Sequence, residues 1–193
     1  VLIQETNLQK IAEGFYNDTY FFDQNACSAP HLIIWTGDTA NIGIAQQKFW
    51  DAVYEEAKKK YRLQTIQAID KLTAFYRQAI NMLVHKTDTQ YDNILVRIQL
   101  KTLPPNIYEF RCTGGYFSEY IAASLKDITA VINNRYQTLA HYGYEKDVLR
   151  QFVIENRLTG IDRIVPIGST TDFTLTWDGY NLISALSRVC TIL

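Results

Sequence analysis

The 193-residue sequence has few cysteines, no excess of either charge and no long apolar run. Its three cysteines, Cys27, Cys112 and Cys190, lie far apart and form no C-x-x-C pair. This spacing argues against a structural metal and indicates a reducing compartment. No stretch approaches the roughly 20 apolar residues that cross a bilayer, and the start lacks the pattern of a signal peptide. We therefore expect a cytoplasmic protein without a membrane span.

The charge balance and the glycine spacing argue against several kinds of ligand. Lys and Arg number 19 against 20 Asp and Glu, so the net charge of -1 gives no footprint for nucleic acid or an anionic membrane. The longest basic run, 58–60, ends a helical pattern and is expected to complement the helix dipole. No G-x-G-x-x-G and no G-x-x-x-x-G-K-[ST] occurs. A nucleotide cofactor would therefore be bound mainly by another part of the polypeptide.

Enough apolar material is present for a sizeable core, since 47% of the residues are hydrophobic and 13% are aromatic. The sequence opens without Met on the strand-like residues 1–3. We expect residues 1–193 to form a single domain, a fragment of a larger fold.

Hydrophobic periodicity predicts helices alternating with strands. Apolar residues at spacings of three and four predict helices from the capping box at 6–9, over 39–60 and 64–83, from 124, over 145–158 and from 178. Apolar runs between breakers predict strands at 1–4, 31–36, 94–100, 107–110, 116–122, 139–142 and 163–167, with a loop at 85–93. The helices at 39–60 and 64–83 are expected to form an antiparallel pair. The order predicts an α/β fold with three layers and a largely parallel sheet.

One stretch, FDQNACSAP (22–30), places Cys27 among small and polar residues just before the apolar run 31–35. The small neighbours Ala26 and Ser28 would let a substrate carbonyl approach the thiol. On spacing alone, an inert cysteine before a strand is the better interpretation, because reactivity depends on surroundings that stabilise the thiolate.

A second stretch, GIDRIVPIG (160–168), is continued by DF (172–173) and WDGY (177–180), and NNRYQTL occupies 133–139. Together with 22–30, these stretches resemble the C-terminal half of the long-chain fatty acyl-CoA reductases of bioluminescent bacteria and their relatives, a branch of the aldehyde dehydrogenase superfamily. The resemblance covers nearly the whole chain and favours Cys27 as a nucleophile. It implies an aldehyde dehydrogenase-like catalytic domain in which Cys27 takes up the acyl group as a thioester and NADPH reduces that thioester to a fatty aldehyde.

The resemblance also implies partners and missing parts. An acyl-CoA or acyl-protein would donate the acyl group, a partner enzyme would activate the fatty acid, and the protein would form homo-oligomers. A cofactor-binding domain would precede Val1, so this fragment alone would be inactive. The Cys27 backbone N–H is the one oxyanion donor that we can name. Relatives place a glutamate that holds the nicotinamide ribose where this chain has 111–115, which contains no acid, so no cofactor contact is assigned there.

Two other functions stay open at this point. An aldehyde-oxidising dehydrogenase of the same superfamily would need a general base that this chain does not identify. A non-catalytic α/β interaction domain would leave Cys27 inert.

Several further side chains have a catalytic and a structural interpretation. His31, His85 and His141 could each assist proton transfer. For each of them a packed or surface histidine is the better interpretation. Isolated glutamates are expected on solvated faces: Glu109, Glu119 and Glu145. An aromatic cluster beside Cys27 would line an acyl tunnel or fill the core: Tyr16, Tyr20, Phe21 and Phe22.

Overall fold

A computed structural model describes residues 5–87 and 91–192. It confirms a mixed α/β protein whose sheets contain parallel strands. The strand expected at 1–4 lies outside the described residues.

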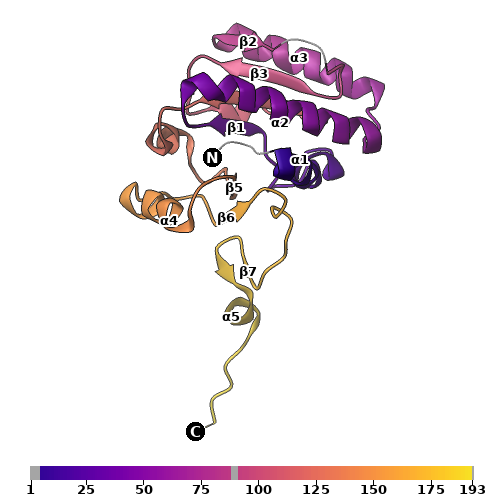
Figure 1. The fold of residues 1–193 in the computed structure, drawn as a ribbon. Helices are drawn as coiled ribbons and strands as arrows, with labels where there is room; N and C mark the ends of the chain where they lie inside the picture. Colours follow the sequence, from indigo (N-terminus) through magenta and orange to yellow (C-terminus); the bar gives the residue numbers. More distant parts are fainter. Residues whose placement is uncertain (1–4, 88–90, 193) are drawn as a thin grey trace.

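The main sheet has four strands in the order β1 (Leu32–Trp35), β4 (Tyr116–Ile121), β3 (Val96–Leu100) and β2 (Val84–Lys86). The first three run parallel, and β2 pairs antiparallel with β3 (Figure 1). β2 lies partly in the stretch predicted as a loop. The strand predicted at 107–110 is instead the 3-10 helix η2 (Ile107–Phe110), because Pro104 and Pro105 begin a turn in which the Ile107 N–H donates to the Pro104 carbonyl.

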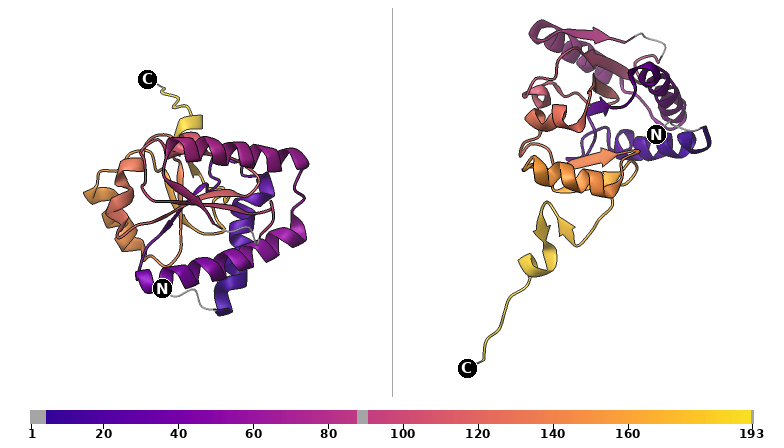
Figure 2. Two further views of the ribbon diagram at one scale, coloured as in Figure 1. Left: turned by 90° about the horizontal axis from the view of Figure 1, so that it is seen from above. Right: turned by 60° about the vertical axis from the view of Figure 1, so that its left-hand side comes forward.

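Helices cover both faces of this sheet (Figure 2). α1 (Glu5–Asp18) and α2 (Thr39–Lys60) lie on one face, where Trp50 packs 5.0 Å from Phe117 of β4. α3 (Thr65–Asn81) lies on the other face, where Gln78 accepts a hydrogen bond from Tyr116. The predicted antiparallel pair of α2 and α3 is therefore wrong. Alternate residues of β4 point to opposite faces, and each face needs its own apolar cover.

A second, two-stranded parallel sheet follows, made of β5 (Thr138–His141) and β6 (Arg163–Pro166) with α4 (Lys146–Glu155) between them. The helix expected from residue 124 is the 3-10 helix η3 (Leu125–Val131). After β6 the chain leaves the body of the molecule, as Figure 1 shows, through the hairpin of β7 (Thr176–Trp177) and β8 (Tyr180–Asn181) and the short α5 (Leu182–Leu186).

The last helix begins later than predicted because residue 178 belongs to a turn. Asp178 and Gly179 have φ values of 49° and 76° and close the β7–β8 hairpin. The helix cap is Asn181, whose side chain accepts from the Ser184 N–H.

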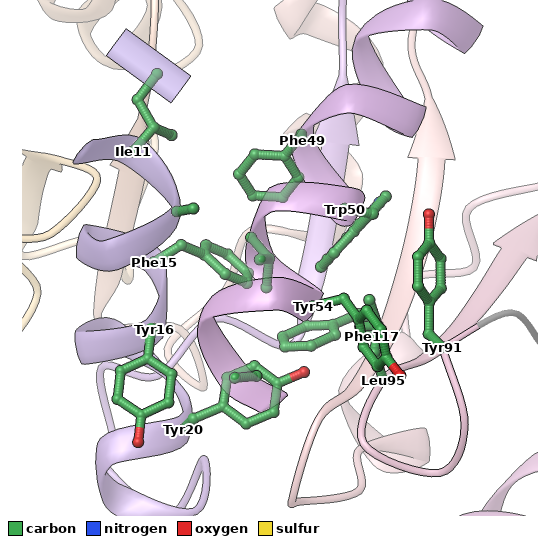
Figure 3. Close-up of a cluster of buried hydrophobic side chains, with 13 residues drawn as sticks. Ile11, Phe15, Tyr16, Tyr20, Phe49, Trp50, Tyr54, Tyr91, Leu95 and Phe117 are labelled. Atoms are coloured by element: carbon green, nitrogen blue, oxygen red, sulfur yellow. The ribbon is translucent and has the colours of Figure 1, made fainter. Parts of the chain in front are cut away.

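The main core lies between α1, α2 and the sheet (Figure 3). Phe15 of α1 meets Phe49 at 5.1 Å and Trp50 at 5.6 Å, both edge to face. Such aromatic contacts combine large buried areas with favourable ring geometry. They fix α1 against α2 and thereby set the position of the loop that leaves α1.

Glu119, expected on a solvated face, is fully buried under this core. Its carboxylate accepts from Arg97 Nε at 2.7 Å and from the indole N–H groups of Trp35 and Trp50, each at 2.8 Å. The charge is thus paired and hydrogen-bonded, which is the condition for burying a carboxylate. Glu109 and Glu145 are exposed, as predicted.

Candidate functional site

The loop after α1 presents Cys27 on a tight turn. The 3-10 helix η1 (Tyr20–Phe22) leads into Asp23 and Gln24, whose φ values of 54° and 57° reverse the chain. Ala29 N–H then donates to the Ala26 carbonyl at 2.9 Å, so Cys27 and Ser28 are the central residues of a turn. The Cys27 side chain is exposed there.

Gln24 holds this loop against the sheet although it carries no chemistry itself. Its side chain is buried, and its Oε1 accepts from the backbone N–H groups of Gly115 at 2.7 Å and Tyr116 at 3.1 Å. Its Nε2 donates to the carbonyls of Pro30 at 3.0 Å and Tyr116 at 3.2 Å. One amide therefore joins both ends of the cysteine loop to the start of β4.

The segment 111–115 packs directly on the cysteine loop. Gly114 N–H donates to the Asp23 carbonyl at 3.2 Å, and Tyr61 donates to the Asp23 carboxylate at 2.6 Å. Gly115 has a φ of 91°, and a Cβ there would lie 2.1 Å from the Ile94 carbonyl oxygen. Gly115 is thus required by the close approach of this segment to the backbone of Ile94.

A cavity of about 400 Å³ opens beside the turn and is lined both from β1, an edge strand of the main sheet, and from β5 of the two-stranded sheet. Cys27 and Ser28 are among its lining residues. Much of the wall is apolar and comes from α1, β1, α2, η3 and β5: Ile11, Phe15, Leu32, Ile34, Phe49, Ile128, Val131 and Leu139. This volume is in the range of sites that take small molecules.

Polar groups interrupt the apolar wall on the β5 side. The buried atoms Gln137 Oε1, Thr138 Oγ1 and His141 Nδ1 have no hydrogen-bond partner among the described residues, and all three residues line the cavity. Buried polar atoms normally have a partner. The cavity therefore suits an occupant that is mostly apolar and carries some polar groups.

Two exposed arginines, Arg111 and Arg135, also line the cavity. Arg111 stands over the Tyr136 ring at 4.9 Å, and Arg135 stands over the Tyr108 ring at 4.7 Å. Guanidinium groups held over aromatic rings keep their N–H donors available for phosphate. This side of the cavity is therefore able to receive an anion.

His31 follows the turn, and a hydrogen bond from its ring holds it in place. Its Nδ1 lies 3.1 Å from the Cys112 carbonyl oxygen and donates to it. Burial, assisted by the charge of Arg111, lowers the pKa of His31 to about 4. The neutral ring is a weak base at neutral pH, which favours a packing role. His141 lines the cavity, where burial lowers its pKa, and His85 is exposed.

The other two cysteines differ from Cys27. Cys112 is half-buried, and burial raises the pKa of its thiol, which favours an inert side chain. Cys190 is exposed in the C-terminal segment, outside the cavity wall.

The aromatic cluster beside Cys27 does not form the cavity wall. Tyr16 and Tyr20 are buried and stack at 5.7 Å in the core, whereas Phe21 and Phe22 are 66% and 50% exposed. For Tyr16 and Tyr20, core packing is the interpretation that the structure supports. Periodicity could not locate the cavity, because its wall combines elements distant in sequence.

In and after the second stretch, 160–168, side chains make hydrogen bonds to backbone groups. Arg163 donates to the carbonyls of Thr170 at 3.1 Å and Asp172 at 2.7 Å and stands 4.5 Å from the Trp177 ring. Buried Asp18, at the end of α1, accepts from the N–H groups of Gly168 at 2.6 Å and Thr170 at 3.0 Å. The loop after β6 is therefore tied to α1, next to the cysteine loop.

The N-terminus of α2 also reaches the cavity, but a carboxylate already caps it. Asp38 accepts from Ala40 N–H at 3.2 Å and from Asn41 Nδ2 at 2.8 Å. A second anion there would meet like charge, so this helix end does not fit the pyrophosphate of NADPH.

Within residues 5–87 and 91–192, no group of three or more His, Cys, Asp or Glu side chains is arranged to hold a metal ion. The helices in the described part of the chain are too short or too polar to cross a membrane.

A scan of the sequence against models of protein families finds no match, and a search of curated proteins finds none.

Proposed function

We propose that this chain is the acyl-accepting part of a fatty acyl-CoA reductase, or of a reductase that takes its acyl group from a protein thioester. The observation that carries the proposal is the position of Cys27, exposed on a tight turn at a largely apolar cavity of about 400 Å³. The resemblance of 22–30 and 160–168 to long-chain acyl-CoA reductases gives the same assignment.

The proposed step is a thioester exchange. Cys27 Sγ attacks the thioester carbonyl of the donor, forming a new S–C bond. The bond from carbon to the CoA sulfur breaks, and the CoA sulfur takes up the proton that Cys27 loses. Thiolates attack thioesters readily and also leave readily, so the acyl group can wait on Cys27 for later reduction.

Each region of the cavity has a part in this step. The apolar wall would hold the acyl chain, the unpartnered polar atoms of Gln137 and Thr138 would meet polar groups near the thioester, and Arg111 and Arg135 would receive the CoA phosphates. Cys27 N–H is the proposed oxyanion donor. The reductive step would use NADPH held mainly by residues outside this chain, in an aldehyde dehydrogenase-like arrangement.

Intact mass of the full-length polypeptide after incubation with tetradecanoyl-CoA, without NADPH, tests this proposal. We expect a gain of one tetradecanoyl group that Cys27→Ala abolishes. Cys190→Ala is the matched control, because it removes another exposed thiol and should retain the adduct. An adduct that persists in Cys27→Ala would refute the assignment. Absence of any adduct would leave a dedicated acyl-protein donor, aldehyde oxidation or an interaction domain.

A second variant tests the cavity separately from the thiol. Ala140 of β5 lines the cavity, and Ala140→Phe would reduce its volume. We expect this variant to accept a short acyl group from acetyl-CoA at the normal rate and to lose acylation by tetradecanoyl-CoA. Equal loss with both donors would show that the cavity does not hold the chain.

A further inference from the structure

The outer face of α3 is apolar and exposed. Its large side chains are between 48% and 83% exposed and recur at helical spacing, continuing just beyond the helix: Ile66, Ile69, Leu72, Tyr76, Ile80 and Leu83. A continuous exposed apolar surface of this kind is typical of an interaction site. We call these six residues the α3 stripe.

The opposite side of α3 is firmly attached to the protein, so the stripe cannot turn inward. Buried Lys71 donates to the carbonyls of Asn93 and Gly114. Buried Gln78 donates to Ser118 Oγ at 3.0 Å and accepts from Tyr116 at 2.7 Å. These polar contacts fix the rotation of the helix about its axis. The stripe is therefore a permanent outer surface of the described structure.

Two exposed charges of opposite sign flank the stripe. Asp70 and Arg77 are the charged residues of α3 besides buried Lys71. They are seven residues apart, which is two helical turns, so both lie along the same edge of the stripe. One edge thus carries an acid near one end and a base near the other.

We propose that the α3 stripe is the contact surface of a homodimer in which two α3 helices pack antiparallel about a two-fold axis near Thr73. In that arrangement Ile66 lies against the partner's Ile80, and each Asp70 faces the partner's Arg77. A parallel pair would instead bring like charges to the same height. The single acid and single base, each facing the other across the axis, fit an isologous contact with a second copy of this chain.

This contact does not compete with the candidate site. The cavity is lined from α1, β1, α2, η3 and β5, whereas α3 covers the other face of the sheet (Figure 2). The dimer proposal is therefore independent of the acyl-transfer proposal. Failure of one leaves the other standing.

Charge reversal at the two flanking residues tests the proposal in the full-length polypeptide. Asp70→Arg and Arg77→Asp each place like charges opposite one another twice in the dimer. We expect each to raise the dimer dissociation constant about tenfold or more in sedimentation experiments at low salt. Asp70→Arg is the cleaner variant, because Arg77 also stands over the Phe110 ring at 5.2 Å. Glu155→Arg, on the exposed side of α4, is the matched control and should change nothing.

Recombining the charges identifies the occupant of the stripe. The double variant Asp70→Arg/Arg77→Asp should dimerise as the natural chain does. A mixture of the two single variants should form a heterodimer, since both facing pairs then join opposite charges. A natural chain that is monomeric, or a dimer unaffected by either reversal, would overturn the proposal. Loss of the dimer that the double variant fails to restore would also overturn it, and would assign the stripe to another segment or protein.

Discussion

Replacing Gln24 by Met should destabilise the protein and displace the cysteine loop. Met keeps the length of the side chain but offers neither the amide oxygen nor the amide N–H groups. Gly115 N–H, Tyr116 N–H and the carbonyls of Pro30 and Tyr116 would each lose a partner. An orphaned buried polar group costs about 1–3 kcal/mol, and entry of water from the adjacent cavity offsets part of that cost. We expect a loss of about 3 kcal/mol in the free energy of unfolding.

Urea unfolding measures this loss, and acylation of Cys27 by tetradecanoyl-CoA measures the displacement of the loop. We expect acylation to slow at least about tenfold, because small misplacements of a reacting group are costly. Gln151→Met is the matched control, since Gln151 is exposed on α4 and bonds Glu155, and such a surface change costs within about 0.5 kcal/mol. Equal unfolding free energies for Gln24→Met and the natural chain would refute the argument that Gln24 anchors the loop.

Three other predictions concern the surrounding scaffold. Glu119→Gln should cost about 3–5 kcal/mol in urea unfolding, because it leaves buried Arg97 without its carboxylate; adding Arg97→Met should recover part of that loss, and a larger loss in the double variant would contradict the ion-pair account. In the folded protein the pKa of His31 is lowered from its usual 6.5 to about 4. As the pH falls, His31 is therefore protonated in the unfolded chain before it is protonated in the folded protein. Stability should therefore be full above pH 6.5 and decline towards pH 4 by up to about 3 kcal/mol, and His31→Asn should remove that part of the decline in thermal melts. Gly115→Ala should lower the unfolding free energy by at least about 3 kcal/mol, because its Cβ would meet the Ile94 carbonyl oxygen at 2.1 Å; a fully stable variant would show that these backbones can separate.

Helices and strands with strong periodicity could be predicted from the sequence. The helix predicted over 39–60 has those bounds in the structure. The strand predicted at 31–36 is one residue shorter at each end, and the strand predicted at 116–122 ends one residue earlier. In each of these elements the apolar spacing repeats several times, so the local preference for a helix or strand agrees with the tertiary packing. The errors occur where single contacts decide, as at Pro104 and at Asp178, where a turn replaces a regular element.

The placement of α3 and the burial of Glu119 could not be predicted in this way. An amphipathic helix shows which of its sides is apolar, but not which face of the sheet it covers. The inner side of α3 carries buried Lys71 and Gln78 beside the partly buried Ala74 and Phe75, while the larger apolar stripe faces outward. Glu119 lies within a predicted strand, but the sequence gives no local sign that Arg97 and two indoles surround it, since these partners come from β1, α2 and β3.

The two stretches that carry the resemblance both contribute residues to the cavity wall, and several of their residues have a structural role. In 22–30, Gln24 completes backbone hydrogen bonds at the start of β4. In 160–168, Arg163 and Gly168 shape a loop that Asp18 ties to the end of α1. These residues would be needed by any protein that holds this turn beside this cavity, whatever the reaction. Cys27 is different, because its exposed side chain supports no neighbouring element through a hydrogen bond in the described residues. A scaffold that spends so many buried polar contacts on positioning one exposed thiol favours a reactive role for that thiol, and comparison of Gln24→Met with Cys27→Ala separates the two contributions: the first should lower both stability and acylation, and the second should abolish acylation alone.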